Sequence, residues 1–158
     1  DDKSKNYKYR DLDGRHALMS RQASHIADKG MILVCSAGNS GAGSWKKITP
    51  PGDADNVLTV GAIDKRAVLA TFSSVGNTAD HRVKPDVVAV GVGSDVIRTD
   101  GNQGRANGTS FSSMAFLESF LPASREASSS FNFLISPITR FSFSLINESC
   151  CSKAEDSN

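Results

Sequence analysis

The hydrophobic and polar positions near the start of the chain predict a helix followed at once by a buried strand. Between residues 14 and 29, apolar residues recur at helical spacing and fall on one face of the predicted helix. These residues are Met19, Ala23, Ile26 and Ala27. Gly30 then provides a stop signal. Residues 31–35 are apolar at every position, which is typical of a strand covered on both faces in a parallel sheet.

The rest of the chain alternates between strand-forming runs and turn residues. Further strands are predicted at residues 57–63 and 86–90, with edge or hairpin strands near 68–72 and 96–98. Proline and glycine at 50–52, and glycines at 91–93 and 101–104, mark the loops between them. This order of elements predicts an α/β fold with a mostly parallel sheet.

Composition changes this picture little. The chain has 158 residues, enough for one domain with a core, and its formal net charge of +1 argues against a nucleic-acid partner. No apolar stretch approaches the length of a transmembrane segment. The three cysteines, one of them Cys35 in the predicted strand, form neither a disulfide framework nor a zinc-binding spacing. The first residues include neither methionine nor an apolar signal region, which indicates an internal start.

The strongest chemical signal is the segment Asn107-Gly108-Thr109-Ser110-Phe111-Ser112-Ser113. A serine behind a glycine at the start of a helix suits a hydroxyl nucleophile. Gly108 leaves room for substrate, and the helix N-terminus stabilises a developing oxyanion. Upstream, Asn39 lies in the loop that leaves the strand of residues 31–35, where ligands gather in open α/β sheets. Ser110 and Asn39 are therefore candidates for two halves of an acyl-transfer site.

These two segments resemble the subtilisin-like serine peptidases, and three further segments fit that family in the same order. They are Asp11-Leu12-Asp13-Gly14-Arg15, Ala70-Thr71-Phe72-Ser73-Ser74-Val75-Gly76 and Arg82-Val83-Lys84-Pro85-Asp86-Val87. The resemblance covers residues 1–113 and implies a subtilisin-like three-layer fold, of which this chain holds the C-terminal part of the catalytic domain. It also implies a serine-type endopeptidase acting on peptides or proteins, without a cofactor, although some family members bind calcium.

The resemblance implies roles for individual residues. In the family, the serine of Gly-Thr-Ser is the nucleophile and the asparagine of the Ala-Gly-Asn loop donates to the oxyanion, so Ser110 and Asn39 are expected to take these roles. Ser36, Ala37 and Gly38 would form one wall of the pocket for the substrate residue that precedes the cleaved bond. No metal ligand is expected in this chain. A secreted or cell-envelope location is the expectation for the family.

The rest of the catalytic triad is not recognisable. A subtilisin-like triad runs Asp, His, Ser along the chain, so both partners of Ser110 should lie far upstream of Asn39. The three histidines are His16, His25 and His81, the first two on the predicted helix, and none has the His-Gly-Thr-His setting of the family. Without a base the serine hydroxyl stays protonated and weakly nucleophilic. We therefore expect negligible peptidase activity from this chain alone.

Residues 114–158 do not fit the family pattern. Met114 stands where the family has a proline, Pro122 follows soon after, and seven of the eight phenylalanines lie from Phe111 onward. The periodicity is poor, so this tail is expected to be irregular. An abrupt change of this kind suggests a frameshift, an alternative exon or a mis-called reading frame, and it sets a domain boundary at residue 113.

Two questions remain open at this stage. Four aspartates, Asp11, Asp13, Asp53 and Asp55, show no interleaved calcium loop and are expected to be solvated surface residues.

Three alternatives are open for the chain itself. It is part of an active endopeptidase, or a noncatalytic remnant that binds peptides or partners, or a product without a stable fold. A product without a stable fold is expected if the missing strands leave sheet edges exposed.

Overall fold

The central sheet has three parallel strands, in the order β1-β2-β5. A computed structural model describes residues 6–127, with side chains described as far as residue 119. The strands are β1 (Leu33–Ser36), β2 (Val57–Ile63) and β5 (Val87–Val90). Val60 in β2 pairs with Ser36 on one side and with Val87 on the other, so the carboxyl ends of the strands lie at one edge. The predicted parallel sheet is confirmed.

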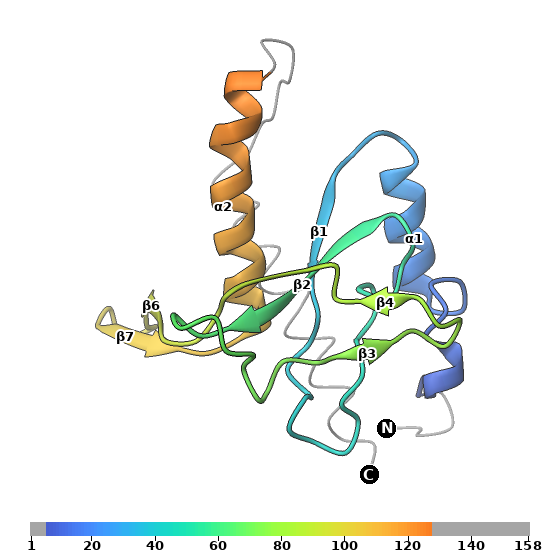
Figure 1. Ribbon diagram of the computed structural model, residues 1–158, viewed down its shortest axis with the longest axis horizontal. Coiled ribbons are helices and arrows are strands. Elements are labelled where there is room, and N and C mark those ends of the chain that lie inside the picture. The colour runs from blue at the N-terminus through green and yellow to red at the C-terminus, as the bar shows by residue number, and fades with distance from the viewer. Residues whose placement is uncertain (1–5, 128–158) are drawn as a thin grey trace.

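Two helices lie on either side of this sheet (Figure 1). Helix α1 (Leu18–Ala27) packs against β1 and β2, and helix α2 (Thr109–Ala127) packs against all three strands. This arrangement is the three-layer α/β architecture expected from the sequence. Within the described part of the chain, no helix is long and apolar enough to cross a membrane.

The core between α1 and the sheet is made of small side chains. Ala23 of α1 packs with Cys35, Ala54 and Val57, and each of these is at most 5% exposed. Burial raises the pKa of the Cys35 thiol to about 12, so it stays protonated near neutral pH. Cys35 is therefore a core residue rather than a reactive thiol.

Helix α1 begins four residues later than predicted, because the chain first forms a turn around Asp13. One carboxylate oxygen of Asp13 accepts hydrogen bonds from the backbone N–H groups of Arg15 (2.9 Å) and His16 (3.0 Å). The placement of His16 on the helix is therefore wrong, since it lies in this turn. Ile26, predicted on the buried face, is 37% exposed. The predicted stop at Gly30 agrees with the end of α1 at Ala27.

Asp13 is expected to make stability depend on pH in the acid range. Burial raises its pKa, but hydrogen bonds from the amides of Arg15 and His16 and from the His16 ring, 2.6 Å away, bring it down to about 2. Because this value is below that of the unfolded chain, the stabilisation is present above pH 4 and is lost as pH falls toward 2. We expect Asp13→Asn to lower the free energy of unfolding by about 1 kcal/mol at pH 6.

Urea unfolding of wild type and Asp13→Asn at pH 6 and pH 2.5 checks this prediction. The difference between the two proteins should shrink at pH 2.5. The control Asp95→Asn, at a carboxylate that is 83% exposed, should change stability little at either pH. A difference for Asp13→Asn that does not vary with pH would contradict the role of its charge.

Short strands form two antiparallel pairs beside the sheet. Strands β3 (Gly76–Asn77) and β4 (Val83–Lys84) form one pair, and β6 (Ser94–Ile97) and β7 (Gln103–Ala106) form the other. The strand predicted near 96–98 corresponds to β6. The strand predicted at 68–72 is wrong, because only an isolated bridge between Ile63 and Leu69 forms there. Strands β3, β4 and β7 were not predicted, since each is short and lacks a run of β-branched residues.

Helix α2 continues well past the point where irregular structure was predicted. The helix runs without a break from Thr109 to Ala127 and so includes residues 114–127. The expectation of irregular structure is therefore wrong for this stretch, because residues such as Met114, Ala115 and Leu117 have high helix propensity. Residues 128–158 of the predicted tail lie outside the described residues.

Asp53 is fully buried, which corrects its assignment to the solvated surface. One carboxylate oxygen accepts a hydrogen bond from the Gly14 backbone (2.9 Å), and the other accepts one from the Ser20 hydroxyl (2.5 Å). Arg82 donates to the Asp53 carbonyl oxygen (2.9 Å). This carboxylate therefore ties the segment that leads into α1 to the loop before β2.

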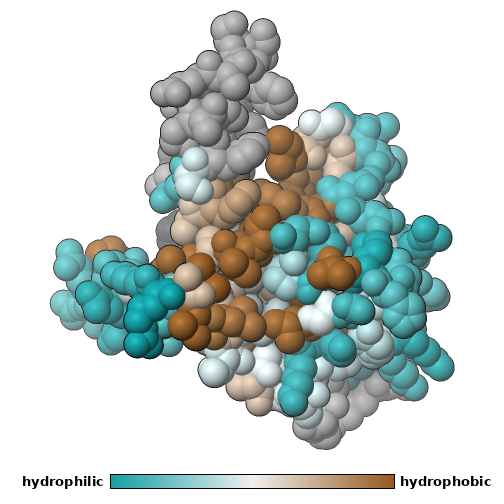
Figure 2. Space-filling model, in the orientation of Figure 1, coloured by the Kyte–Doolittle hydropathy of each residue, from teal (hydrophilic) through white to brown (hydrophobic). Residues whose placement is uncertain are grey.

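Hydrophobic surface remains uncovered on the described part of the chain. Figure 2 shows a band of hydrophobic residues between α2 and the β3–β4 pair, whereas the β6–β7 hairpin is mostly hydrophilic. Met31 and Ile32, which precede β1, are 56% and 47% exposed, and Val88 of β5 is 47% exposed. The expectation that residues 31–35 are all covered therefore holds only for the later part of that run.

Candidate active site

The two candidate segments meet at the carboxyl edge of the sheet, although they are far apart in sequence. Asn39 lies three residues beyond the end of β1, as predicted, and Ser110 is the second residue of α2. Both side chains are half-buried. Helix α2 packs over β1, β2 and β5, and this packing brings its N-terminus to the loop that carries Asn39.

Asn39 is bonded directly to the start of α2. Its side-chain oxygen accepts hydrogen bonds from the Thr109 backbone N–H (2.9 Å) and from the Thr109 hydroxyl (3.0 Å). The Thr109 hydroxyl in turn accepts a hydrogen bond from the Gly38 backbone N–H (3.1 Å). Among the described residues, the Asn39 side-chain nitrogen has no hydrogen-bond partner, so it is left to donate elsewhere.

Space beside the Asn39 amide is kept open by Gly108. A Cβ atom at residue 108 would lie 3.7 Å from Asn39 Nδ2 and 3.4 Å from the Phe111 ring. The Gly108 backbone N–H donates to the carbonyl oxygen of Gly91, just beyond β5 (2.9 Å). Gly108 is therefore held in place while leaving room next to the amide donor.

The Ser110 hydroxyl lies at the N-terminal end of α2, where backbone N–H groups and the helix dipole favour negative charge. Within the stretch that the structure describes, this hydroxyl has no hydrogen-bond partner. The Ser110 carbonyl oxygen accepts a hydrogen bond from the Ser113 hydroxyl (2.8 Å). The serine is thus held by its backbone, and its side chain is unengaged.

The three residues expected to line a substrate pocket lie next to Asn39 but are themselves buried. Ser36 is 2% exposed, and Ala37 is fully buried. Gly38 has φ of +105°, and a Cβ there would come within 2.7 Å of the Thr49 hydroxyl. Their small size therefore allows close packing inside the fold. Their role as one wall of a substrate pocket stays a prediction.

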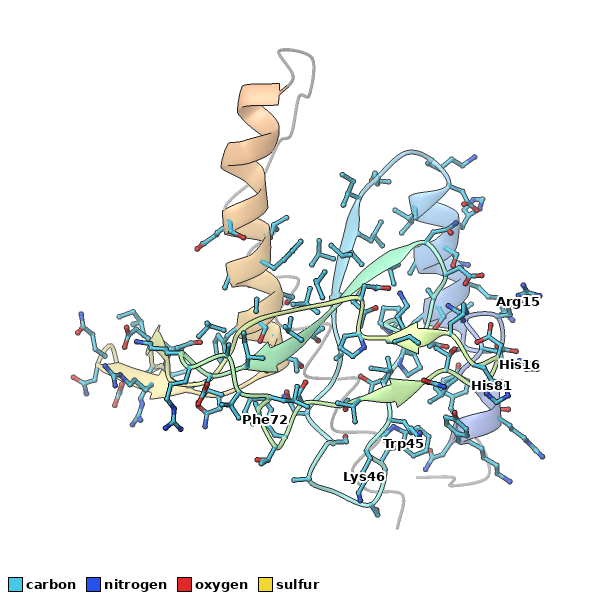
Figure 3. The ribbon with its side chains drawn as sticks, viewed as in Figure 1. Arg15, His16, Trp45, Lys46, Phe72 and His81 are labelled. Carbon is cyan, nitrogen blue, oxygen red and sulfur yellow. The ribbon has the colours of Figure 1, made fainter. Side chains whose placement is uncertain are left out.

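The histidines lie away from Ser110. His16 precedes α1, His25 is in its last turn, and His81 lies between β3 and β4; all three are exposed. Figure 3 places His16 and His81 on the side of α1 and the β3–β4 pair, well away from the base of α2. No described histidine is therefore in position to act as a base for Ser110.

The described acidic residues do not build a metal centre. Among the residues that the structure describes, no group of three or more His, Cys, Asp or Glu side chains could hold a metal ion. The carboxylates considered for calcium are already engaged, since Asp53 binds Gly14 and Ser20 and Asp13 binds the turn before α1. Both carboxylates are therefore engaged within the fold.

Thr109 and Gly91 also contact the site, and the sequence assigned no role to either. Thr109 bonds to Asn39, which lies 70 residues away in the chain. Gly91 accepts a hydrogen bond from Gly108 through its backbone carbonyl oxygen, which the sequence does not reveal. Only the position of Thr109 beside Ser110 could have drawn attention to it.

Comparison with known proteins gives the family of this chain. A model of the subtilase family, peptidase S8, matches residues 3–115. The chain is similar to serine protease AprX of Bacillus subtilis (strain 168), with 40% identity over 70 residues, covering 40% of this chain and 16% of AprX. It is also similar to subtilisin DY of Bacillus licheniformis, with 38% identity over 85 residues, covering 53% of this chain and 29% of that protein.

A solved structure supports the same fold. The self-cleaved protease domain of PatA matches with a TM-score of 0.52 and 26% identity, covering 64% of this chain and 36% of that domain. The chain thus spans less than a third of these two curated relatives and about a third of the solved protease domain. Because the family model covers most of its residues, this chain belongs to the subtilase family of serine proteases, peptidase S8.

Proposed function

We propose that this chain carries the nucleophile and one oxyanion donor of a serine-type endopeptidase. Ser110 is the nucleophile and Asn39 the oxyanion donor. The observation that carries the proposal is the orientation of the Asn39 amide. Its oxygen is held by Thr109, and its nitrogen has no partner among the described residues and lies beside the space left by Gly108.

In the proposed reaction, Ser110 Oγ attacks the carbonyl carbon of a peptide bond and forms a tetrahedral intermediate. The carbonyl oxygen becomes an oxyanion, which accepts a hydrogen bond from Asn39 Nδ2 and is stabilised by the N-terminus of α2. The amine leaves as the acyl-enzyme forms, and water then hydrolyses the ester. Ser36, Ala37 and Gly38 form one wall for the substrate residue before the cleaved bond.

The proton of Ser110 needs a base, and none of the described histidines lies at the site. The exposed histidines lie near α1 and the β3–β4 pair. A histidine and an aspartate from elsewhere in a complete catalytic domain would have to complete the triad. We therefore infer that this chain alone is inactive, because loss of the base costs several orders of magnitude in rate.

Labelling with a fluorophosphonate tests the inactivity. This reagent forms a bond between an activated serine oxygen and phosphorus and releases fluoride. The chain is expected to label no more than its Ser110→Ala variant under conditions that label subtilisin completely, as read by intact-protein mass spectrometry. Stoichiometric labelling of Ser110 would show that a base is present and would contradict the proposed inactivity.

Peptide binding without cleavage is the second candidate function. It is favoured because the Ser110 hydroxyl and the Asn39 side-chain nitrogen both lack partners among the described residues and could donate to a peptide carbonyl. Calorimetric binding of an unlabelled peptide library to wild type, weakened in Asn39→Ala, would support it. A cooperative thermal transition of the chain would separate both candidates from a product without a stable fold.

A further inference from the structure

Asn107 is the only asparagine in the sequence that is followed directly by glycine. It lies in the short connection between β7 and α2 and is exposed (Figure 1). Asparagine is thermolabile, because the backbone nitrogen of the next residue can attack its side-chain amide. That attack is least hindered when the next residue is glycine, which has no Cβ and restricts the backbone least. Asn107 therefore combines two conditions that favour deamidation.

Two hydrogen bonds at this connection act on that reaction in opposite directions. The Gly93 backbone N–H donates to Asn107 Oδ1 (2.8 Å). This bond polarises the side-chain carbonyl and stabilises the negative charge that its oxygen gains during attack. The attacking atom is the Gly108 nitrogen, whose N–H donates to the Gly91 carbonyl oxygen (2.9 Å). The nitrogen has to leave Gly91 before it can lose its proton and attack.

We propose that the Asn107-Gly108 pair is a site of spontaneous deamidation and that the hydrogen bond from Gly108 to Gly91 controls its rate. The deprotonated Gly108 nitrogen forms a bond to Asn107 Cγ, the bond from Cγ to Nδ2 breaks, and the nitrogen leaves as ammonia with the proton that Gly108 gave up. Water then opens the resulting succinimide ring at one of its two carbonyl carbons, which gives aspartate or isoaspartate. The inference does not depend on the proposed catalytic roles of Ser110 and Asn39.

The two products differ in their effect on the start of α2. Aspartate keeps an oxygen that can accept from the Gly93 N–H and adds a negative charge. Isoaspartate carries the main chain through the former side chain and so lengthens it by one carbon atom. Only Gly108 separates residue 107 from Thr109, the first residue of α2, so the longer main chain shifts Gly108 away from Gly91. Isoaspartate is therefore expected to loosen the N-terminus of α2.

Incubation of the chain at pH 8 and 37 °C, followed by peptide mapping with mass spectrometry, tests the site. Circular dichroism first confirms that the chain is folded, and isoaspartyl methyltransferase labels any isoaspartate. Asn107 should convert to the acid, and it should convert about tenfold faster in guanidinium chloride, where no bond to Gly91 has to open. No conversion of Asn107 in the folded chain would overturn the proposed site. Equal rates in the folded and the unfolded chain would overturn the control by the bond to Gly91.

Two comparisons isolate the chemistry of the Asn-Gly pair. Asn102, in the turn of the β6–β7 hairpin, is also exposed but is followed by Gln103, so it should stay unmodified. Gly108→Ala keeps Asn107 and adds a Cβ, whose nearest neighbour beyond the adjacent residues is the Phe111 ring at an ordinary contact distance of 3.4 Å. This variant should deamidate about tenfold more slowly, because the methyl group hinders the attack. Conversion of Asn102 as fast as Asn107, or an unchanged rate in Gly108→Ala, would contradict the proposal.

Hydrogen exchange measures the consequence for α2. The backbone N–H groups of Phe111 and Ser112 donate to the Gly108 carbonyl oxygen, at 3.2 and 3.4 Å, so they report on the position of Gly108. The aged, isoaspartate-rich chain is compared with Asn107→Asp, which carries the same charge on an unaltered main chain. These amides should exchange about tenfold faster in the aged chain than in Asn107→Asp. Equal exchange in the two proteins would contradict the displacement of Gly108.

Discussion

In a catalytically complete protein that contains this segment, Asn39→Ala is expected to lower kcat by roughly 10²- to 10³-fold while KM changes little. This is the size of loss known for an oxyanion donor of subtilisin. The selectivity for kcat follows from where the bond is made, because the amide nitrogen donates to a charge that is present only in the transition state. Steady-state kinetics on a peptide substrate measure it.

Asn39 also accepts two hydrogen bonds from Thr109, so folding has to be checked alongside the rate. Circular dichroism and thermal unfolding of Asn39→Ala should show a folded protein at the assay temperature. Asn102→Ala, at an exposed asparagine in the turn of the β6–β7 hairpin, is the control and should keep full activity. A loss confined to KM would show that Asn39 binds substrate uniformly rather than stabilising the oxyanion.

Asp53→Ala is expected to lower the free energy of unfolding by about 3 kcal/mol, enough to unfold a marginally stable domain. The carboxylate is fully buried and accepts hydrogen bonds from Gly14 and Ser20. Its removal leaves both donors buried without a partner and opens a small cavity. Urea unfolding of this chain, followed by circular dichroism, gives the midpoint and hence the loss.

Asp55→Ala is the matched control two residues away. Asp55 pairs with Arg82 at 2.8 Å but is 46% exposed, and exposed ion pairs contribute at most about 1 kcal/mol. The two variants remove the same charge, so a difference between them reports burial and hydrogen bonding rather than net charge. Equal losses in Asp53→Ala and Asp55→Ala would contradict the role assigned to Asp53.

The parts of the fold that the sequence predicted are those with a strong local pattern. The β2 strand was predicted with its observed bounds because Val57 to Ile63 is apolar almost throughout and follows a turn. Asn39 and Ser110 were found because a strand end and a Gly-Thr-Ser turn each have a recognisable local sequence. Their roles in catalysis follow from resemblance and stay predictions.

One error came from contacts that link distant residues, and two came from local patterns that were misjudged. The burial of Asp53 depends on Gly14 and Ser20, which no local pattern connects to it. His16 was placed on a helix because the helical periodicity extends into the turn that Asp13 holds. Residues 114–127 were expected to be irregular because Pro122 usually breaks a helix, yet the helix continues through it.

The 70-residue separation between Asn39 and Thr109 also bears on when the site comes into existence. Closing so long a loop costs entropy that two hydrogen bonds cannot offset, so the packing of α2 on the sheet has to supply the remainder. A chain still emerging from the ribosome, or one whose α2 has detached, therefore has no oriented amide beside its serine. In an endopeptidase that contains this segment, the proposed oxyanion donor would therefore become available only after α2 has packed on the sheet.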